Sequence, residues 1–149
     1  PTGCIRDDYT IDAGRCISYL TIENKGKIPD DLKPLIGDWI FGCDVCQIVC
    51  PHNAWTPEQK YVLGEARLPE YLDLLALFSL SEEEFNEKFC GTPILRTKRK
   101  GMLRNAAVVL GNQRYEPALP ILKSAIKHET DEAVLDACDW AIQQITAKS

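Results

Sequence analysis

The sequence has only two histidines, no long apolar run and fewer basic than acidic residues. His52 and His128 leave few candidates for acid-base chemistry on imidazole. No Ser-His-Asp set, paired catalytic carboxylates or phosphate-cradling glycine loop stands out. The longest apolar stretches, such as residues 74–78, are far shorter than the roughly 20 residues of a bilayer-spanning helix, and we expect no membrane segment. The formal net charge of -5 gives by itself no reason to expect nucleic acid.

Cysteine is the residue that this chain of 149 residues has in abundance, with seven copies. Cys43, Cys46 and Cys50 lie within one short segment that ends in Pro51, and Cys16 stands alone upstream. Spacings of two and then three residues followed by proline are typical of one arm of a two-cluster ferredoxin motif, in which a short CxxC turn brings thiolates to one cluster edge. In such motifs the last cysteine serves the other cluster. We therefore expect Cys16, Cys43 and Cys46 on one 4Fe-4S cluster and Cys50 on its neighbour.

Each cluster then lacks ligands within this chain. The chain opens with Pro1-Thr2-Gly3 and no initiator methionine, as a segment does when it continues from the last cysteine of an earlier motif. We expect an upstream half that carries the remaining ligands. The odd cysteine count and the clustered spacing do not resemble a disulfide framework, which favours a reducing, cytoplasmic compartment.

The remaining candidate ligands have simpler interpretations. Cys138 falls on an apolar stripe and Cys90 ends a predicted helix, so both are predicted to be small buried hydrophobic residues. Cys4 has no partner at ligand spacing and is predicted to be a packed, unligated thiol. His52 is predicted to lie on the surface of the module rather than to bind metal.

The pattern of the sequence changes near Trp55. Residues 1–55 are rich in glycine, proline and cysteine and show little periodicity, which is typical of a small module organised by metal coordination. Short helical turns are plausible at 29–35 and just after Trp39. From residue 56 to residue 149 the sequence is helical. The prediction is a mainly α fold, with a small ferredoxin-like iron-sulfur module followed by HEAT-like α-helical repeats.

Several local signals place the helices. Thr56-Pro57 is a helix start, and Ser81-Glu82-Glu83-Glu84 is a capping box. Helices are expected at 69–78 and 82–89. Three later stripes have helical spacing: Leu103, Ala106, Ala107 and Leu110; Ala118, Ile121, Leu122, Ala125 and Ile126; and Val134, Cys138, Ala141 and Ile145. Gly111-Asn112 and residues 128–131 are expected to separate them. A plain helical bundle would give the same pattern as stacked repeats.

A run of basic residues with no acidic neighbour interrupts the acidic composition. It comprises Arg96, Lys98, Arg99, Lys100 and Arg104. A concentrated positive patch would attract a phosphate backbone, although an ordinary solvated helix entrance is an equal alternative. No aromatic residue lies within the run to offer a platform for base stacking.

Two segments of the module, residues 15–23 and 40–51, closely resemble the iron-sulfur portion of epoxyqueuosine reductase. Residues 91–93, the basic run and residues 104–106 look like the entry to that family's C-terminal HEAT-like region, so the resemblance covers essentially the whole chain. One departure is His52, where the family more often has tryptophan.

The resemblance implies a reaction, namely removal of the epoxide oxygen of epoxyqueuosine in tRNA with cobalamin and two 4Fe-4S clusters. It implies that Cys16, Cys43 and Cys46 bind one cluster, that Cys50 binds the other, and that an external donor supplies the electrons. Arg96, Arg99, Arg104 and Asn105 match the family's motif at the helical region and are expected to contact tRNA, together with Lys98 and Lys100 of the same run. The cobalamin domain and the catalytic acid would lie upstream, which makes this chain a C-terminal fragment.

Two other classes of protein stay open at this point. One is a stand-alone electron-transfer ferredoxin with a helical appendage. The other is a nucleic-acid-binding module stabilised by zinc, with Cys16, Cys43, Cys46 and Cys50 as a Cys4 site. The proline after Cys50 and the two-then-three spacing favour iron.

Overall fold

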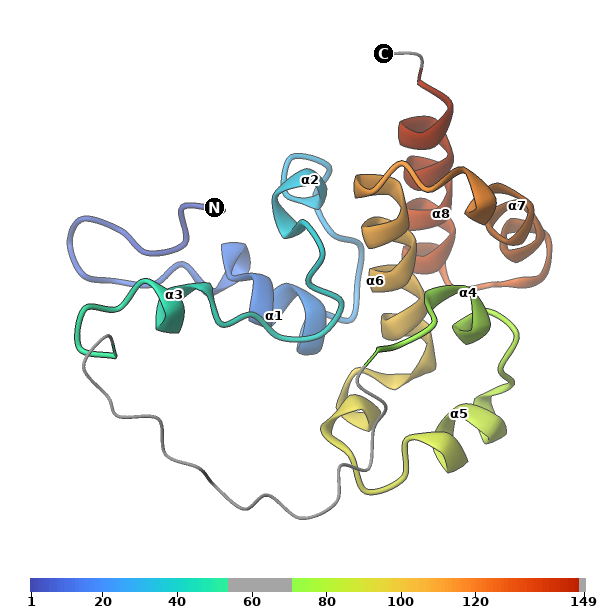
Figure 1. Cartoon of the computed structure of the whole chain (residues 1–149), viewed down its shortest axis with the longest axis horizontal. Helices are drawn as coiled ribbons and strands as arrows, with labels where there is room; N and C mark the ends of the chain where they lie inside the picture. Colours follow the sequence, from blue (N-terminus) through green and yellow to red (C-terminus); the bar gives the residue numbers. More distant parts are fainter. Residues whose placement is uncertain (54–70, 148–149) are drawn as a thin grey trace.

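The computed structural model describes residues 1–53 and 71–147 and consists of two packed parts (Figure 1). The N-terminal module, residues 1–53, contains a 3-10 turn and three short helices, namely η1 (Ala13–Arg15), α1 (Ile17–Ile22), α2 (Lys33–Ile36) and α3 (Val45–Ile48). The helical region, residues 71–147, contains α4 (Leu74–Leu77), α5 (Glu82–Lys88), η2 (Pro93–Arg96), α6 (Lys98–Asn112), η3 (Glu116–Ala118), α7 (Leu119–His128) and α8 (Glu132–Thr146). Across these two ranges the β structure is one isolated antiparallel bridge between Ile5 and Ile11.

This architecture confirms the mainly helical prediction. None of the helices in the described parts is both long and apolar enough to cross a bilayer. The helix start expected at Thr56-Pro57 and the boundary expected near Trp55 lie outside the described residues.

The long helix α6 is the centre of the structure. Every residue from Gly101 to Gly111 is buried, because α8 lies along one side of α6 while α1, α2, α4 and α5 contact its other sides (Figure 1). The apolar stripe that begins at Leu103 predicted a helix with one buried face. That prediction was incomplete, since the polar face of α6 is covered as well.

The sequence suggested a helix end at Gly111, but the helix continues through this residue. Gly111 lies within α6, and a β-carbon at this position would come within 2.7 Å of the Trp140 ring and 2.9 Å of the Ala141 backbone. A side chain there would therefore push α8 away from α6. The break between the first two stripes instead falls at residues 113–115.

The other helix ends follow the local signals more closely. In the capping box of α5, the Ser81 side chain accepts a hydrogen bond from the Glu84 amide and the Glu84 carboxylate accepts one from the Ser81 amide, at 3.2 and 2.7 Å. The helix expected at 69–78 is shorter: α4 begins after Asp73, whose carboxylate accepts from the amides of Leu75 and Ala76. The break predicted at 128–131 is confirmed, and Asp131 caps α8.

The module is attached to the helical region by polar side chains of α6 that bind main-chain carbonyls at and beyond the end of α1. Arg104 donates to the carbonyls of Leu20, Asn24 and Gly26, each at 2.7 Å. The last carbonyls of a helix have no partner within it, so a buried helix end needs donors from elsewhere. Arg104 is only 1% exposed, and burial lowers the pKa of its guanidinium to about 10, while the charge of Asp131 acts in the opposite direction.

Two further side chains complete this junction. Asn105, also 1% exposed, donates to the carbonyls of Thr21 and Ile40, each at 2.8 Å. Its own amide oxygen accepts two hydrogen bonds from Arg104. The hydroxyl of Thr97 donates to the Thr21 carbonyl at 3.2 Å. We call Thr97, Arg104 and Asn105 the junction residues.

The expectation that Arg104 and Asn105 contact tRNA is therefore corrected. Both side chains lie in the interior and their polar groups are taken up by the main chain of the module. Their role in this structure is to hold the two parts of the protein together.

A buried lysine makes a second link between the two parts. The Lys33 side chain is 1% exposed, and its ammonium lies 2.7 Å from Asp30 and 2.6 Å from Asp136 of α8. The carbonyls of Lys33 and Gly37 accept hydrogen bonds from the Asn112 side chain. Burial alone would raise the pKa of Asp136, but the hydrogen bonds and charges of Lys33 and Lys27 outweigh it and hold the pKa below its ordinary value.

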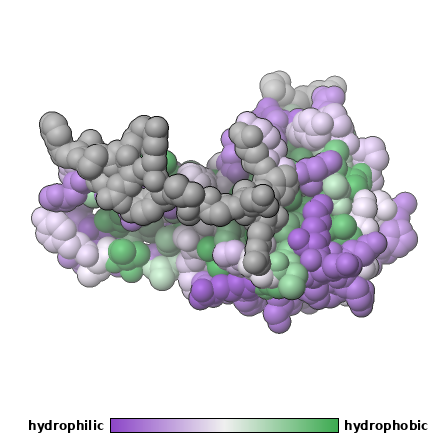
Figure 2. All heavy atoms as spheres, turned by 60° about the horizontal axis from the view of Figure 1, so that its bottom comes forward, coloured by the Kyte–Doolittle hydropathy of each residue, from purple (hydrophilic) through white to green (hydrophobic). Residues whose placement is uncertain are grey.

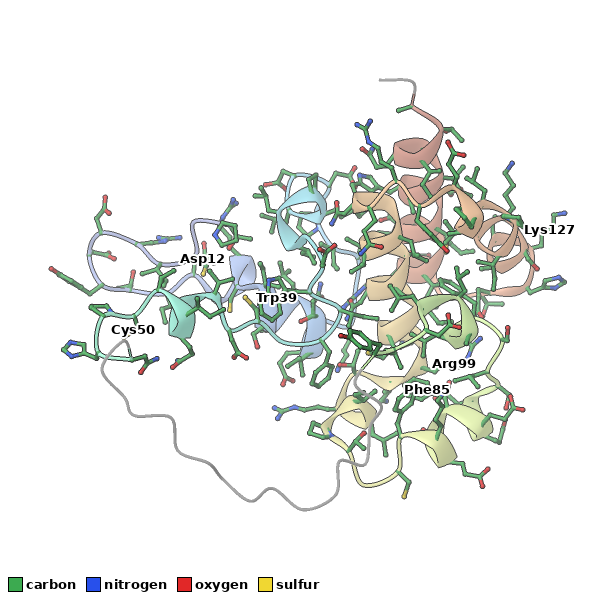
Figure 3. All side chains as sticks on the ribbon, in the orientation of Figure 1. Asp12, Trp39, Cys50, Phe85, Arg99 and Lys127 are labelled. Carbon is green, nitrogen blue, oxygen red and sulfur yellow. The ribbon has the colours of Figure 1, made fainter. Side chains whose placement is uncertain are left out.

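We predict that Arg104→Met destabilises the protein by about 3 kcal/mol or more, because buried carbonyls lose charged donors. Urea unfolding followed by circular dichroism measures the change. Lys127→Met is the matched control, since Lys127 is exposed on α7 (Figure 3), and we expect it to shift stability by no more than about 0.5 kcal/mol. Equal unfolding midpoints for the two variants would contradict the role given to Arg104.

A second prediction concerns acid stability. The pKa of Asp136 is lowered from 3.8 in the folded state. The stability that its charge contributes is therefore present above pH 3.8 and is lost as pH falls through the pKa of the folded state. Asp136→Asn should lower the unfolding free energy by about 2 kcal/mol near neutral pH. The gap between variant and wild type should narrow as pH falls below 3.8 and close below the pKa of Asp136 in the folded state, where both side chains are uncharged. A gap that stays constant with pH would refute this account.

Candidate metal centre

Three of the four predicted ligands line one hollow in the module. Cys16, Cys43 and Cys46 share the walls of a cavity of about 260 Å³. Cys50 does not belong to this lining and lies toward the outer end of the module (Figure 3). The structure thus groups the thiols as the motif predicted for two neighbouring clusters. The assignment of each thiol as a ligand stays a prediction.

Short local structures place the three thiols. Cys16 precedes the first residue of α1, and its carbonyl accepts the first hydrogen bond of that helix, from Leu20 at 2.9 Å. Cys46 lies in the first turn of α3, which begins after Asp44. Both positions leave the cysteine at the start of a helix, on the wall of the hollow.

Cys43 is positioned by the glycine before it. Gly42 has a φ of +73°, a backbone conformation that residues with a side chain rarely adopt, and its amide donates to the Thr21 hydroxyl at 3.0 Å. Thr21 is buried, and the same hydroxyl donates to the carbonyl of Ile17. The backbone next to Cys43 is therefore tied to α1, whose first turn follows Cys16.

Apolar residues complete the hollow. Ile17, Val45 and Val49 line it together with residues 1–5. Apolar cover of this kind limits access of water to metal-bound sulfur and so influences the potential of a cluster. Cys4, predicted to be a packed, unligated thiol, is half-buried and lines this same cavity.

The four thiols of the proposed zinc set are not grouped around one point. Sulfur ligands of zinc converge to about 2.3 Å from one point. In residues 1–53 and 71–147, no three side chains of His, Cys, Asp or Glu lie close enough together to hold one ion. The thiols instead stand around a cavity, and the fourth member of the proposed zinc set, Cys50, is outside it.

The basic run does not form a patch of unpaired cations. Arg99 is 15% exposed, and its guanidinium binds both carboxylate oxygens of Glu129, at 2.6 and 3.1 Å, and the carbonyl of Leu80. Lys100 pairs with Asp131 at 2.9 Å. These acidic partners are distant in sequence, which is why the local composition did not reveal them.

Three members of the run are exposed, namely Arg96, Lys98 and Lys100. Arg96 is 68% exposed although its guanidinium pairs with Glu23 at 2.6 Å, and Lys98 is exposed at the start of α6. Lys98 has a φ of +65°, unusual for a residue with a side chain. The prediction that Arg96 and Lys98 contact tRNA stays open.

The cysteines outside the module differ from each other. Cys138 is fully buried, as predicted, and burial with the charges of Asp139 and Glu129 raises the pKa of its thiol to about 12. The prediction for Cys90 was wrong, because this thiol is exposed. His52 is exposed as expected.

Comparison with known proteins supports the metal centre. Residues 1–53 match the family described as a 4Fe-4S double cluster binding domain. The epoxyqueuosine reductase of Shewanella oneidensis is 42% identical over 153 residues, which cover 97% of this chain and 37% of that protein. The chain therefore spans less than half the length of this curated relative.

Solved structures give the same result. The epoxyqueuosine reductase from Bacillus subtilis has a TM-score of 0.81 at 33% identity, with 97% of this chain and 39% of that chain covered. An epoxyqueuosine reductase with a tRNA-Tyr epoxyqueuosine-modified tRNA stem loop has a TM-score of 0.67 at 27% identity, with 99% and 48% covered. The resemblance inferred from residues 15–23 and 40–51 is confirmed.

Proposed function

The chain is related to the epoxyqueuosine reductases along 97% of its length, and from that relationship we propose that it is the electron-transfer and tRNA-contacting part of such an enzyme. The observation that carries the proposal is the hollow in the module. Cys16 and the first two cysteines of the ferredoxin-like motif, Cys43 and Cys46, line it, whereas the last cysteine of the motif, Cys50, does not. This is the arrangement that two clusters sharing one cysteine motif require.

In this proposal Cys16, Cys43 and Cys46 hold one 4Fe-4S cluster and Cys50 contributes to a second. Bound clusters of this kind would pass single electrons from an external donor toward the cobalamin of the parent protein. The residues of this chain hold the sulfurs at fixed positions, and Ile17, Val45 and Val49 give the hollow apolar walls. We assign no catalytic residue here, since the cobalamin domain and the catalytic acid would belong to the rest of the parent.

The module has an apolar outer surface that suits contact with the rest of the parent. Ile5, Ile11, Ile48 and Val49 are between 59% and 73% exposed. Figure 2 shows hydrophobic areas interspersed with hydrophilic ones on the face that it displays. Exposed apolar side chains gathered on one small module are typical of a surface that another domain covers.

The substrate in this proposal is tRNA that carries epoxyqueuosine, which the parent would reduce to queuosine in the cytoplasm. One structural relative was solved with such a modified tRNA stem loop. Within the helical region, which we propose to be HEAT-like, Arg96, Lys98 and Lys100 are the exposed members of the basic run, and we propose that Arg96 and Lys98 meet phosphate.

Metal analysis tests the cluster assignment. The parent protein, purified without oxygen, should contain about eight iron and eight sulfide per chain. Cys46→Ala should lose about half of both, because one cluster loses a ligand, whereas Cys90→Ala should lose none since Cys90 does not line the hollow. Zinc without sulfide in the wild type would sink the electron-transfer proposal and favour the zinc-module alternative.

A second test concerns tRNA. Replacing Arg96 and Lys98 together by glutamine in the parent should weaken tRNA binding and reduce the slope of log K against log salt by about one for each phosphate that the protein no longer binds. Lys127→Gln serves as the control, because this exposed lysine lies on α7, away from the basic run (Figure 3). Unchanged affinity and slope in the double variant would leave the basic run as a solvated face.

A further inference from the structure

We infer that Thr21 is a positioning residue for the proposed cluster, because its hydroxyl joins the residues next to two of the ligands. The hydroxyl donates a hydrogen bond to the carbonyl of Ile17, which follows Cys16, at 2.8 Å. It accepts one from the amide of Gly42, which precedes Cys43, at 3.0 Å. The inference rests on the proposed function, since it assumes that the hollow binds a 4Fe-4S cluster.

Cys16 and Cys43 line the same hollow but come from segments that are far apart in the chain. Cys16 precedes α1, whereas Cys43 lies between α2 and α3. Within residues 1–53 and 71–147, the main chain of Cys43 makes no hydrogen bond to other residues. Its position therefore depends on the residues on either side, of which Gly42 is the one bonded to α1.

The segment that leads to Cys43 is held at a second point next to Thr21. The side-chain amide of Asn105 donates both to the Thr21 carbonyl and to the Ile40 carbonyl, each at 2.8 Å. The Thr97 hydroxyl also donates to the Thr21 carbonyl, at 3.2 Å. With its main chain fixed in this way, Thr21 presents its hydroxyl at a defined place, and residues 40–42 are fastened to α1 at both ends.

Burial makes the contact with Gly42 hard to replace. Thr21 is fully buried, so water cannot take over the role of its hydroxyl. Without that hydroxyl the amide of Gly42 would lack its acceptor, which is costly away from water. The turn at Gly42 would shift to find another partner, and Cys43 would move with it.

Thr146 offers a matched comparison. Its hydroxyl donates to the carbonyl of Ile142, four residues earlier in α8, at 2.7 Å, as that of Thr21 does within α1. Thr146 is exposed, however, and its hydroxyl accepts no amide from the described part of the chain. Valine at either position removes the same bond within a helix, but only at Thr21 does it also remove the acceptor of Gly42.

The test uses the parent protein, purified without oxygen, with its clusters in place. Wild type is compared with Thr21→Val, which keeps the shape of the side chain, with Thr21→Ser, which keeps the hydroxyl, and with the control Thr146→Val. Release of iron to a chelator is followed over time. The reduction potential of each cluster is measured by a titration followed by electron paramagnetic resonance.

We expect Thr21→Val to release about half of its iron roughly tenfold faster than wild type, because only the cluster at the hollow loses the support of Gly42. The other half should leave at the wild-type rate, and the potential of one cluster alone should shift. Thr21→Ser and Thr146→Val should behave as wild type in both measurements. If Thr21→Val does not fold, Thr21→Ser and Thr21→Ala decide the question, since these two differ only in the hydroxyl and Thr21→Ala alone should show the fast release.

Three results would overturn the inference and leave the proposed function standing. One is iron release from Thr21→Val at the wild-type rate. Another is equal acceleration for all of the iron, which would show that Thr21 supports the fold in general rather than one cluster. The third is release from Thr21→Ser as fast as that from Thr21→Ala. If the wild-type parent contains no sulfide, the proposed function itself fails, so the two failures are distinguishable.

Discussion

The end of α1 is the point on which the rest of the structure depends. This helix is only six residues long, so most of its carbonyls have no partner within it, and its C-terminal half is buried against α6. The junction residues Thr97, Arg104 and Asn105 supply the missing donors. The same helix begins directly after Cys16. A single short element therefore connects the proposed cluster at one end to the central helix of the protein at the other.

The chemistry of arginine explains why a charged residue can occupy this buried position. A guanidinium presents five N–H donors in a rigid fork, which lets Arg104 reach three carbonyls and the Asn105 side chain together. The C-terminus of a helix also carries partial negative charge, which favours a cation there. Lysine has one nitrogen and could not replace these contacts. The lowered pKa of about 10 still leaves Arg104 charged at neutral pH, so the contacts persist under ordinary conditions.

Local features were predictable from the sequence, and features that depend on distant contacts were not. The capping box at Ser81 and the grouping of Cys43 with Cys46 depend on residues close in the chain, and both lie as expected in the structure. Arg104 and Asn105 lie on the polar side of an apolar stripe, which ordinarily faces solvent. Only the packing of α1 against that side shows that they are buried. The errors at Gly111 and in the basic run have the same origin, because Trp140 approaches the glycine and the acidic partners of the run arrive from other segments.

The two parts of the protein share one apolar core, which links metal binding to the helical region. Ile17 and Leu20 of α1 belong to the same buried cluster as Leu103 of α6. A module this small cannot bury enough apolar surface to be stable alone, so its order comes from this shared core and from any bonds to metal. Asn105 of the junction holds Thr21, and the Thr21 hydroxyl accepts a hydrogen bond from the amide of Gly42, the residue before Cys43. Loosening the junction would therefore disturb the position of Cys43, a proposed ligand, from the far end of α1. The helical region is in this sense part of the metal site, although none of residues 71–147 lines the hollow.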